Sequence, residues 1–359
     1  LPIPLLAPVI HIFFLFLIIL RLYNNLLIGE INFSMNETKH FYSLDLFRGF
    51  CGYGVAFCHL QAFVYKNIEM EYFSLLFVDF FFVLSGFVLY PQLMKILNDK
   101  KNLIIFYKRR WIRTLPLYVI ILFIVSALTS ELLSKDFFKY LFFIQKIIPN
   151  FINNDYYPVA WSLSIEELFY LFFPILILGF NKQNIINYTI IIFFGILIFK
   201  YFLTSDLDSN FFRTGTLLRF DAIVLGFLLR HFYFKLLKLK FFLLSIFIII
   251  FSIYYLGQNY IISLQEEHEI KYMFILMLQL LSVLSVLLFT FIEPLIIKHN
   301  LIKNFSLLVS KQTYSVYLIH IIFIYLLEKI QFSLLITNFI YMSSLFVFSL
   351  LIFNYIEKP

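Results

Sequence analysis

The chain has 359 residues, of which 62% are hydrophobic, 21% are aromatic and only 14% are charged, and its mean hydropathy is +0.91. A soluble domain of this size does not need so much apolar surface, so the composition excludes an ordinary soluble protein and predicts a polytopic membrane protein. The formal net charge of +7 therefore indicates how the loops are oriented across a membrane, and not an affinity for nucleic acid.

Residues 1–34 contain an apolar run at 4–20 of marginal spanning length, which ends at Arg21. Three interpretations stay open: an additional helix, an uncleaved signal-like segment, or upstream translation of a protein that begins at Met35. The pattern from Met35 onward is self-sufficient, which favours the third interpretation. Residues 35–359 are predicted to form one membrane domain.

From Asp45 onward the sequence predicts an all-α bundle of about ten membrane-spanning helices. A shorter apolar run at 137–149 is more typical of a re-entrant or interfacial segment. The loop at 95–113 carries seven basic residues, so the positive-inside rule puts it and both ends of the ten-helix unit in the cytoplasm. The spans are expected at 45–66, 71–92, 114–133, 162–180, 185–203, 216–232, 239–257, 270–291, 313–330 and 333–355.

The first predicted span holds an arginine and a histidine on one face. Arg48 and His59 are eleven residues apart, which places them within roughly 20° of each other around a helix and about 16 Å apart along it. Ionisable groups inside a membrane are costly and usually face a cavity or a partner, so the pair predicts a functional site. The alternative is an arginine that reaches the membrane surface and a histidine bonded to a neighbouring helix.

The second predicted span runs in the opposite direction and carries Asp79 at about the depth of His59. An imidazole and a carboxylate at one depth suit a general base and the acid that orients it. The alternative is that Asp79 is neutral or bonds to another helix. Ser85 and Gly86 interrupt the same span, which indicates close helix packing first and space for a ligand second.

Arg110 and Arg113 share a helical face at the entry to the third span because they are three residues apart. Guanidinium groups hold phosphates in a two-pronged geometry that lysine cannot reproduce. Alone, the two arginines would be interpreted as an anchor for anionic lipid headgroups. With Arg48 entering from the same side, they predict a phosphate-bearing ligand from the cytoplasm.

The fourth span carries Glu166 about one turn inside the outer surface, between Trp161 and Tyr170, which are interpreted as interface aromatics. The neighbouring Glu167 points about 100° away, so only one of the two carboxylates is expected to face a given cavity.

Two further polar groups occur in later spans. Arg219 and Asp221 lie near the outer end of the sixth span, where they are expected to neutralise each other or a charge on another helix rather than to catalyse. The ninth span begins with a polar stripe at helical spacing, formed by Tyr314, Ser315, Tyr317 and His320.

These segments together resemble acyltransferase family 3, the integral-membrane acyltransferases that include O-antigen and exopolysaccharide O-acetylases. The resemblance covers Asp45 to Pro359. It implies an enzyme of the bacterial plasma membrane, an acyl-CoA donor from the cytoplasm, an acceptor hydroxyl on an envelope glycan, and important roles for the Arg-x10-His and Arg-x-x-Arg residues. The matching segments, in the family's order, are LDLFRG with its Arg-x10-His pair, VDFFFVLSGF, RRWIRTLP, WSLSIEELFYLFFP, RFDAIVLG, YSVYLIH and IEKP.

A mechanism follows from these residues and from the resemblance. The donor, acyl-CoA and most simply acetyl-CoA, is expected to bind at Arg48, Ser85, Arg110 and Arg113. His59, oriented by Asp79 or Glu166, would deprotonate the acceptor hydroxyl or relay the acyl group. The acceptor, an envelope glycan or lipid-linked sugar, would approach from the outer side near Trp161, Arg219 and Asp221. No bound cofactor and no metal are expected.

Two other classes of protein remain as alternatives. A transporter or flippase for a lipid-linked or acylated envelope precursor would use the same polar residues as a path, but the sequence carries no internal repeat. A membrane glycosyltransferase would be expected to carry acidic residues in a longer first outer loop than KNIEME. Hydrolysis of acetyl-CoA by the purified protein separates the first hypothesis from both.

Overall fold

The computed structural model describes residues 40–203, 205–327 and 333–357, in which every regular element is a helix. Within these residues eight helices are long and apolar enough to cross a membrane. The prediction of an all-α polytopic bundle is therefore confirmed. The interpretations of residues 1–34 lie outside the described residues.

The long helices coincide with the predicted spans. α2, the first of them, is not among the eight, because Asp45, Arg48 and His59 make it more polar than the others. One of the eight covers residues 217–263 and contains both α9 and α10. The long helices are α2 (Tyr42–Val64), α3 (Ile68–Asn98), α4 (Lys101–Leu128), α6 (Trp161–Leu178), α7 (Ile185–Leu203), α9 (Phe220–Leu236), α10 (Lys240–Ser263), α11 (His268–Phe291), α13 (Asn300–Leu327) and α14 (Leu334–Ile352).

Two helices begin earlier than their apolar runs. α4 begins at Lys101 rather than near residue 114, and α13 begins at Asn300 rather than near residue 313. Hydropathy detects only the part of a helix that suits hydrocarbon, whereas the backbone stays helical through the polar residues before it. Arg110 and Arg113 consequently lie within α4. Short helices α5 (Lys135–Leu141), α8 (Ser209–Thr214) and α12 (Glu293–Lys298) connect the long ones.

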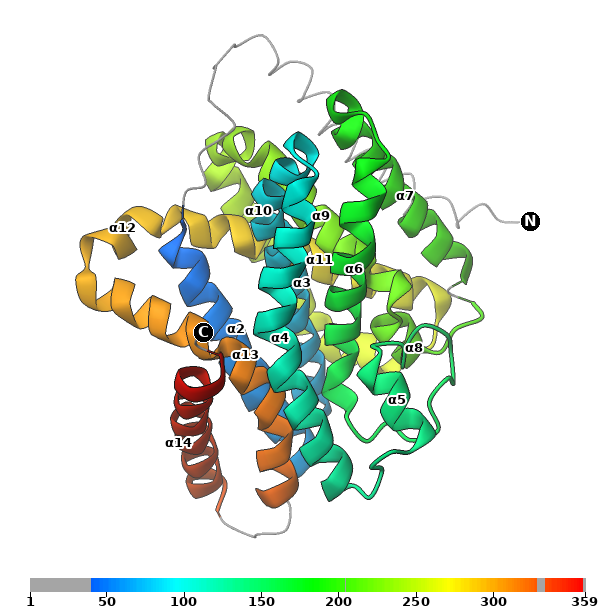
Figure 1. Cartoon of the computed structure of the whole chain (residues 1–359), viewed down its shortest axis with the longest axis vertical. Coiled ribbons are helices and arrows are strands. Elements are labelled where there is room, and N and C mark those ends of the chain that lie inside the picture. The colour runs from blue at the N-terminus through cyan, green and yellow to red at the C-terminus, as the bar shows by residue number, and fades with distance from the viewer. Residues whose placement is uncertain (1–39, 204, 328–332, 358–359) are drawn as a thin grey trace. The chain divides into compact units, whose positions relative to one another are not determined.

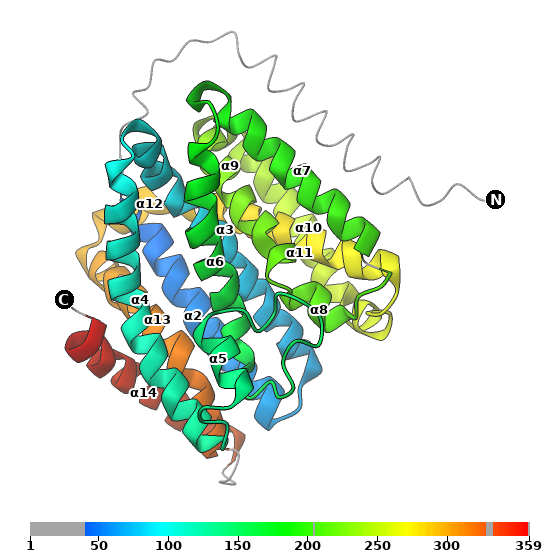
Figure 2. The same cartoon turned by 45° about the vertical axis from the view of Figure 1, so that its right-hand side comes forward.

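α2 and α3 run side by side through the middle of the described helices (Figures 1 and 2). α2 packs between α3 and α13, while α3 also packs on α9 and α11. α7 and α10 lie further out on α9 and α11, and α14 lies on α13. α4 and α6 cover the side of the central helices that α9 and α11 leave open.

α12 fixes the start of α2. The carboxylate of Glu293 accepts hydrogen bonds from the backbone amides of Tyr42 (3.1 Å) and Ser43 (2.7 Å), and the Glu293 side chain is buried. The first amides of a helix have no partner inside the helix and carry partial positive charge, so a carboxylate stabilises them. On the next turn, Ser310 of α13 donates to Asp45 at 2.8 Å. These contacts fix the end of α2 from which Arg48 projects.

α3 and α9 approach each other at a pair of glycines. A Cβ atom added to Gly86 would overlap the carbonyl oxygen of Ile223, and one added to Gly226 would overlap that of Val83. Small residues allow helix backbones to approach closely where no hydrophobic effect drives association. The packing interpretation of Gly86 is therefore confirmed, and the contact sets the position of Ser85 beside it.

Replacing Gly86 by alanine is expected to lower the free energy of unfolding by about 1–3 kcal/mol, because the two backbones must move apart. Gly195→Ala in α7 is the matched control, since a Cβ there meets nothing within 4 Å. Thermal unfolding in detergent compares the two variants with the unmodified protein. Equal midpoints for Gly86→Ala and Gly195→Ala would contradict this account of the α3–α9 contact.

Candidate functional site

A cavity of about 580 Å³ lies between α2, α3, α4, α6 and α13. All four residues predicted to bind the donor line this cavity, namely Arg48, Ser85, Arg110 and Arg113, and Glu166 lines it as well. Its volume falls within the range of small-molecule and cofactor sites. Residues that are up to 269 positions apart in the sequence (Arg48 and Tyr317) thus contribute to one site.

Cations outnumber carboxylates on the cavity wall. Lys95 and Arg109 line it together with the three predicted arginines, and the acidic residues on the wall are Glu166 and Glu167. Arg113 lies within electrostatic range of both Arg48 and Arg110. Clustered like charges repel one another unless an anion lies between them, so the wall suits an anionic ligand.

Arg110 is held in place by an aromatic ring. Its guanidinium group stacks on Tyr170 of α6, 3.1 Å from the ring centroid, and the Tyr170 hydroxyl is hydrogen-bonded to Ser85 of α3. Tyr170 is fully buried and lines the cavity, so its interpretation as an interface aromatic is wrong. The Nε atom of Arg110 is buried and has no hydrogen-bond partner among the described residues. A stacked guanidinium that lines the cavity suits an oxygen acceptor on a ligand.

The two carboxylates of α6 both line the cavity. The expectation that only one of them would face it is wrong, because the cavity extends around α6 far enough to include side chains that point about 100° apart. Glu167 is buried, and its Oε2 atom has no hydrogen-bond partner among the described residues.

His59 and Asp79 have different partners. The Nδ1 atom of His59 lies 2.9 Å from Nε2 of His320, whereas Asp79 forms a buried ion pair with Arg219, the residue directly before α9. The predicted pairing of His59 with Asp79 is therefore wrong, and the stated alternative, a bond from Asp79 to another helix, is correct. The rotation of α3 about its axis turns Asp79 toward Arg219 and α9.

His59 does not belong to the cavity wall, but it lies close to it. Tyr317 lines the cavity, and its hydroxyl is hydrogen-bonded to Ser162 at 2.6 Å. The ring of Tyr317 contacts that of His320, with centroids 5.6 Å apart, and His320 contacts His59. Two side chains in succession, Tyr317 and His320, thus connect the end of the cavity to His59.

The three candidate residues for the acceptor lie away from the cavity wall. Arg219 pairs with Asp79, and Asp221 pairs with the buried Lys200 of α7, so these two charges join α9 to α3 and α7. Trp161 packs edge-on against Phe82, with centroids 5.8 Å apart. The contacts of Arg219 and Asp221 fit the sequence-based prediction that these residues neutralise charges on other helices.

Comparison with known proteins identifies the family. Residues 41–356 match the acyltransferase domain family. The chain belongs to this family. It is 30% identical over 217 residues to the O-acetyltransferase OatA of Staphylococcus aureus strain NCTC 8325 / PS 47, an alignment that covers 54% of this chain and 35% of that relative. The match to OatA of strain MRSA252 has the same identity and coverage. The chain thus spans about a third of the length of these curated relatives, and no solved structure matches it.

Most of the segments that carry the family resemblance meet at the cavity. LDLFRG contributes Arg48, RRWIRTLP contributes Arg110 and Arg113, and YSVYLIH contributes Tyr317. RFDAIVLG contributes the ion-paired Arg219 and Asp221 instead. In the last segment, Glu357 accepts a hydrogen bond from Ser315 of α13.

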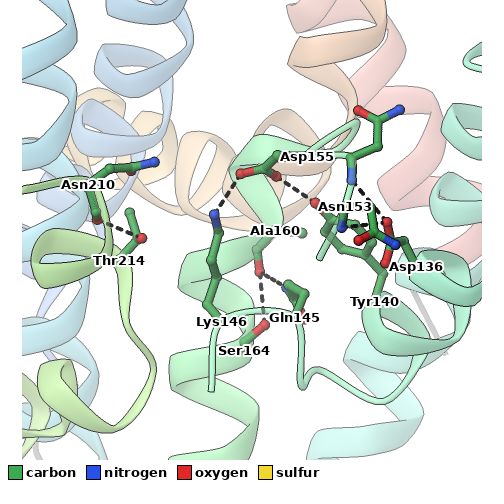
Figure 3. Close-up of polar contacts among 11 residues, drawn as sticks. Asp136, Tyr140, Gln145, Lys146, Asn153, Asp155, Ala160, Ser164, Asn210 and Thr214 are labelled. Carbon is green, nitrogen blue, oxygen red and sulfur yellow. Dashed lines mark hydrogen bonds and ion pairs between the residues drawn. The ribbon is translucent and has the colours of Figure 1, made fainter. Parts of the chain in front are cut away.

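The loop at 134–161 is held by its own polar side chains (Figure 3). Asp136 accepts hydrogen bonds from Lys139 (2.8 Å) and from the backbone amides of Asn153 (2.8 Å) and Asn154 (2.9 Å). Asp155 accepts from Tyr140 (2.6 Å) and forms an ion pair with Lys146 (2.7 Å). Burial raises the pKa of Asp136, but the hydrogen bonds from Lys139 and the two amides outweigh it and lower the pKa below its ordinary value.

A carboxyl group with a lowered pKa stabilises the fold at pH values above the ordinary aspartate pKa of about 3.9, and this stabilisation is lost as the pH falls through the lowered value. Asp136→Asn is therefore expected to lower the free energy of unfolding by about 1.5–3 kcal/mol near neutral pH, and by progressively less below about pH 4. The exposed Asp208, whose side chain makes no capping bond, provides Asp208→Asn as control. Thermal unfolding across this pH range measures both, and a constant difference for Asp136→Asn would contradict the prediction.

Proposed function

We propose that the protein is an integral-membrane O-acyltransferase that moves an acyl group from acyl-CoA to a hydroxyl of a cell-envelope glycan. The observation that carries the proposal is the cavity whose wall combines the arginines of α2 and α4 with the carboxylates of α6. Membership of the acyltransferase family and the name of the O-acetyltransferase OatA relatives support an acyl group, and specifically acetyl, as the group transferred.

The charge of the cavity supports coenzyme A as the carrier of the acyl group. Coenzyme A combines several phosphates with a long flexible arm that ends in the thioester. Arg48, Arg110 and Arg113 would bind the phosphates, with the stacked Arg110 best placed for a two-pronged contact. Along α3 the wall extends from Lys95 to Val78, about 25 Å at 1.5 Å per residue, so an extended arm fits along it.

The direction of the arm follows from the order of these residues. Lys95 and Arg109 lie close to the junction of α3 and α4, in the basic segment that the positive-inside rule assigns to the cytoplasm. Val78, Ser162 and Tyr317 lie toward the other end, beside the two histidines. A donor bound by its phosphates at the cytoplasmic end would thus carry its thioester toward His59. Placement in the bacterial plasma membrane, with both ends of the bundle in the cytoplasm, belongs to this proposal.

The transfer step needs one base. His59 would take the proton of the acceptor hydroxyl as its oxygen bonds to the thioester carbonyl carbon. The carbon–sulfur bond then breaks, and the leaving thiolate of coenzyme A takes the proton from His59. The products are the ester and free coenzyme A, and His59 returns to its starting state.

The arginines are tested by the affinity of the donor. Arg110→Ala and Arg113→Ala are each expected to weaken acetyl-CoA binding roughly ten- to a hundredfold, the equivalent of about 1.5–3 kcal/mol for a lost charge-assisted contact. Lysine at either position should recover only part of this loss. Lys108→Ala is the matched control, because Lys108 is exposed on the same helix and is not part of the cavity wall. Undiminished affinity in the double alanine variant would instead favour the lipid-anchor interpretation.

The purified full chain in lipid vesicles tests both the proposed acyl transfer and the assignment of His59 as its base. In the presence of envelope glycan the unmodified protein should release free thiol from acetyl-CoA, and His59→Gln should reduce that rate by about 10²–10⁴-fold without changing acetyl-CoA affinity. Movement of a substrate across the vesicle membrane without thiol release would favour a transporter. A near-normal rate per folded molecule in His59→Gln would move the base to Glu166.

A further inference from the structure

His320 of α13 makes a contact that the proposed transfer step does not yet use. Its ring lies edge to edge with that of His59 and nearly in the same plane, with an interplanar angle of 26° and centroids 5.1 Å apart, and Nε2 of His320 lies 2.9 Å from Nδ1 of His59. His320 is 0% exposed and His59 is 9% exposed. A hydrogen bond between two buried imidazoles fixes which nitrogen of each ring carries a hydrogen.

The direction of this hydrogen bond follows from the other nitrogen of His320. Its Nδ1 lies 2.7 Å from the backbone carbonyl oxygen of Tyr317. A carbonyl oxygen can only accept, so Nδ1 of His320 carries a hydrogen. Among the described residues, the hydrogen-bond partners of the two rings are each other and backbone carbonyl groups, none of which carries a negative charge, and an uncompensated positive charge inside the bundle is costly. In a neutral His320, Nε2 therefore has a lone pair and accepts from Nδ1–H of His59.

The backbones that carry the two histidines are joined at the same level. Tyr341 of α14 donates a hydrogen bond from its hydroxyl to the carbonyl oxygen of Ala56, at 3.0 Å, and the same hydroxyl lies 3.5 Å from the carbonyl oxygen of His320. Tyr341 is 0% exposed. α2 and α13 are thus connected through α14 next to the histidine pair, which holds the two rings in hydrogen-bonding geometry.

We propose that His320 is a positioning residue that holds His59 as the Nδ1–H tautomer, so that the Nε2 lone pair of His59 is the atom that accepts the proton of the acceptor hydroxyl. The inference rests on the proposed function, in which His59 is the base. When Nε2 takes up the proton, Nδ1–H of His59 continues to donate to Nε2 of His320, which stabilises the imidazolium until its proton passes to the thiolate.

A neutral imidazole takes here the place that a carboxylate occupies beside many catalytic histidines. The two carboxylates considered as partners for His59 are engaged or placed elsewhere. Asp79 is paired with Arg219, and Glu166 lies on the cavity wall. A neutral partner places no negative charge in the apolar interior, while it still determines which nitrogen of His59 is free.

The tautomer is measured directly by nitrogen NMR of the full chain in lipid nanodiscs, with histidine labelled at both ring nitrogens. The chain has seven histidines, and spectra of His59→Gln and His320→Gln assign the two signals by difference. The proposal expects protonated Nδ1 and unprotonated Nε2 for both His59 and His320. A protonated Nε2 on neutral His59 would overturn it, whatever the activity of the preparation.

Two variants of His320 separate positioning from packing. His320→Gln can place a side-chain oxygen near the former Nε2 and still accept from His59, whereas His320→Leu fills similar space without an acceptor. The leucine variant is expected to lose roughly ten- to a hundredfold in kcat with an unchanged KM for acetyl-CoA, and the glutamine variant to recover most of that loss. Rates are expressed per folded molecule, and the exposed His299 supplies His299→Gln as control. Equal losses in the glutamine and leucine variants, or a normal kcat in leucine, would overturn the proposal.

These measurements fail separately from the proposed function. If the unmodified protein releases no thiol from acetyl-CoA, or if His59→Gln keeps the normal rate, the proposed function or its base is wrong. The NMR result still decides whether His320 fixes the tautomer of His59, because it requires no turnover.

Discussion

The architecture depends on how an apolar bundle accommodates charge. Two ion pairs, Asp79 with Arg219 and Lys200 with Asp221, are buried among α3, α7 and α9. Removing one partner of such a pair leaves an uncompensated charge in the interior, which is strongly destabilising. The pairs therefore constrain the rotation of α3 about its axis, because Asp79 must face α9. That rotation directs Ser85 toward the cavity on the other side of the helix.

On the cavity wall, in contrast to these ion pairs, positive charges are concentrated and outnumber the negative charges. Arg48, Arg110 and Arg113 line one space with Glu166 and Glu167, and Arg110 is held by stacking on Tyr170 rather than by an ion pair. A folded chain can keep such a group only where a ligand or water compensates it. The charged residues that join helices are paired with an opposite charge. The charged residues of the proposed donor site face the cavity instead.

The histidine pair is accommodated inside the bundle without carrying charge. His59 and His320 are bonded to each other, and His320 is also bonded to a backbone carbonyl, so three of the four ring nitrogens have hydrogen-bond partners inside the bundle without ionisation. Tyr317 lines the end of the cavity, and its ring contacts that of His320. The two histidines thus lie where the end of the cavity and the interior of the bundle meet. In the proposed reaction this arrangement keeps the base neutral and oriented until a hydroxyl arrives.

The sequence alone determined the elements and their depths. Runs of about 20 apolar residues predict spans because hydrocarbon excludes unpaired backbone groups, and residue number converts to depth at 1.5 Å per residue. That is why the long helices and the shared face of Arg110 and Arg113 could be predicted. Only the tertiary structure decided the partners. The rotation of each helix depends on side chains distant in sequence, such as Arg219 facing Asp79, Tyr170 beneath Arg110 and His320 beside His59. No local pattern in one helix records which residue of another helix lies opposite it.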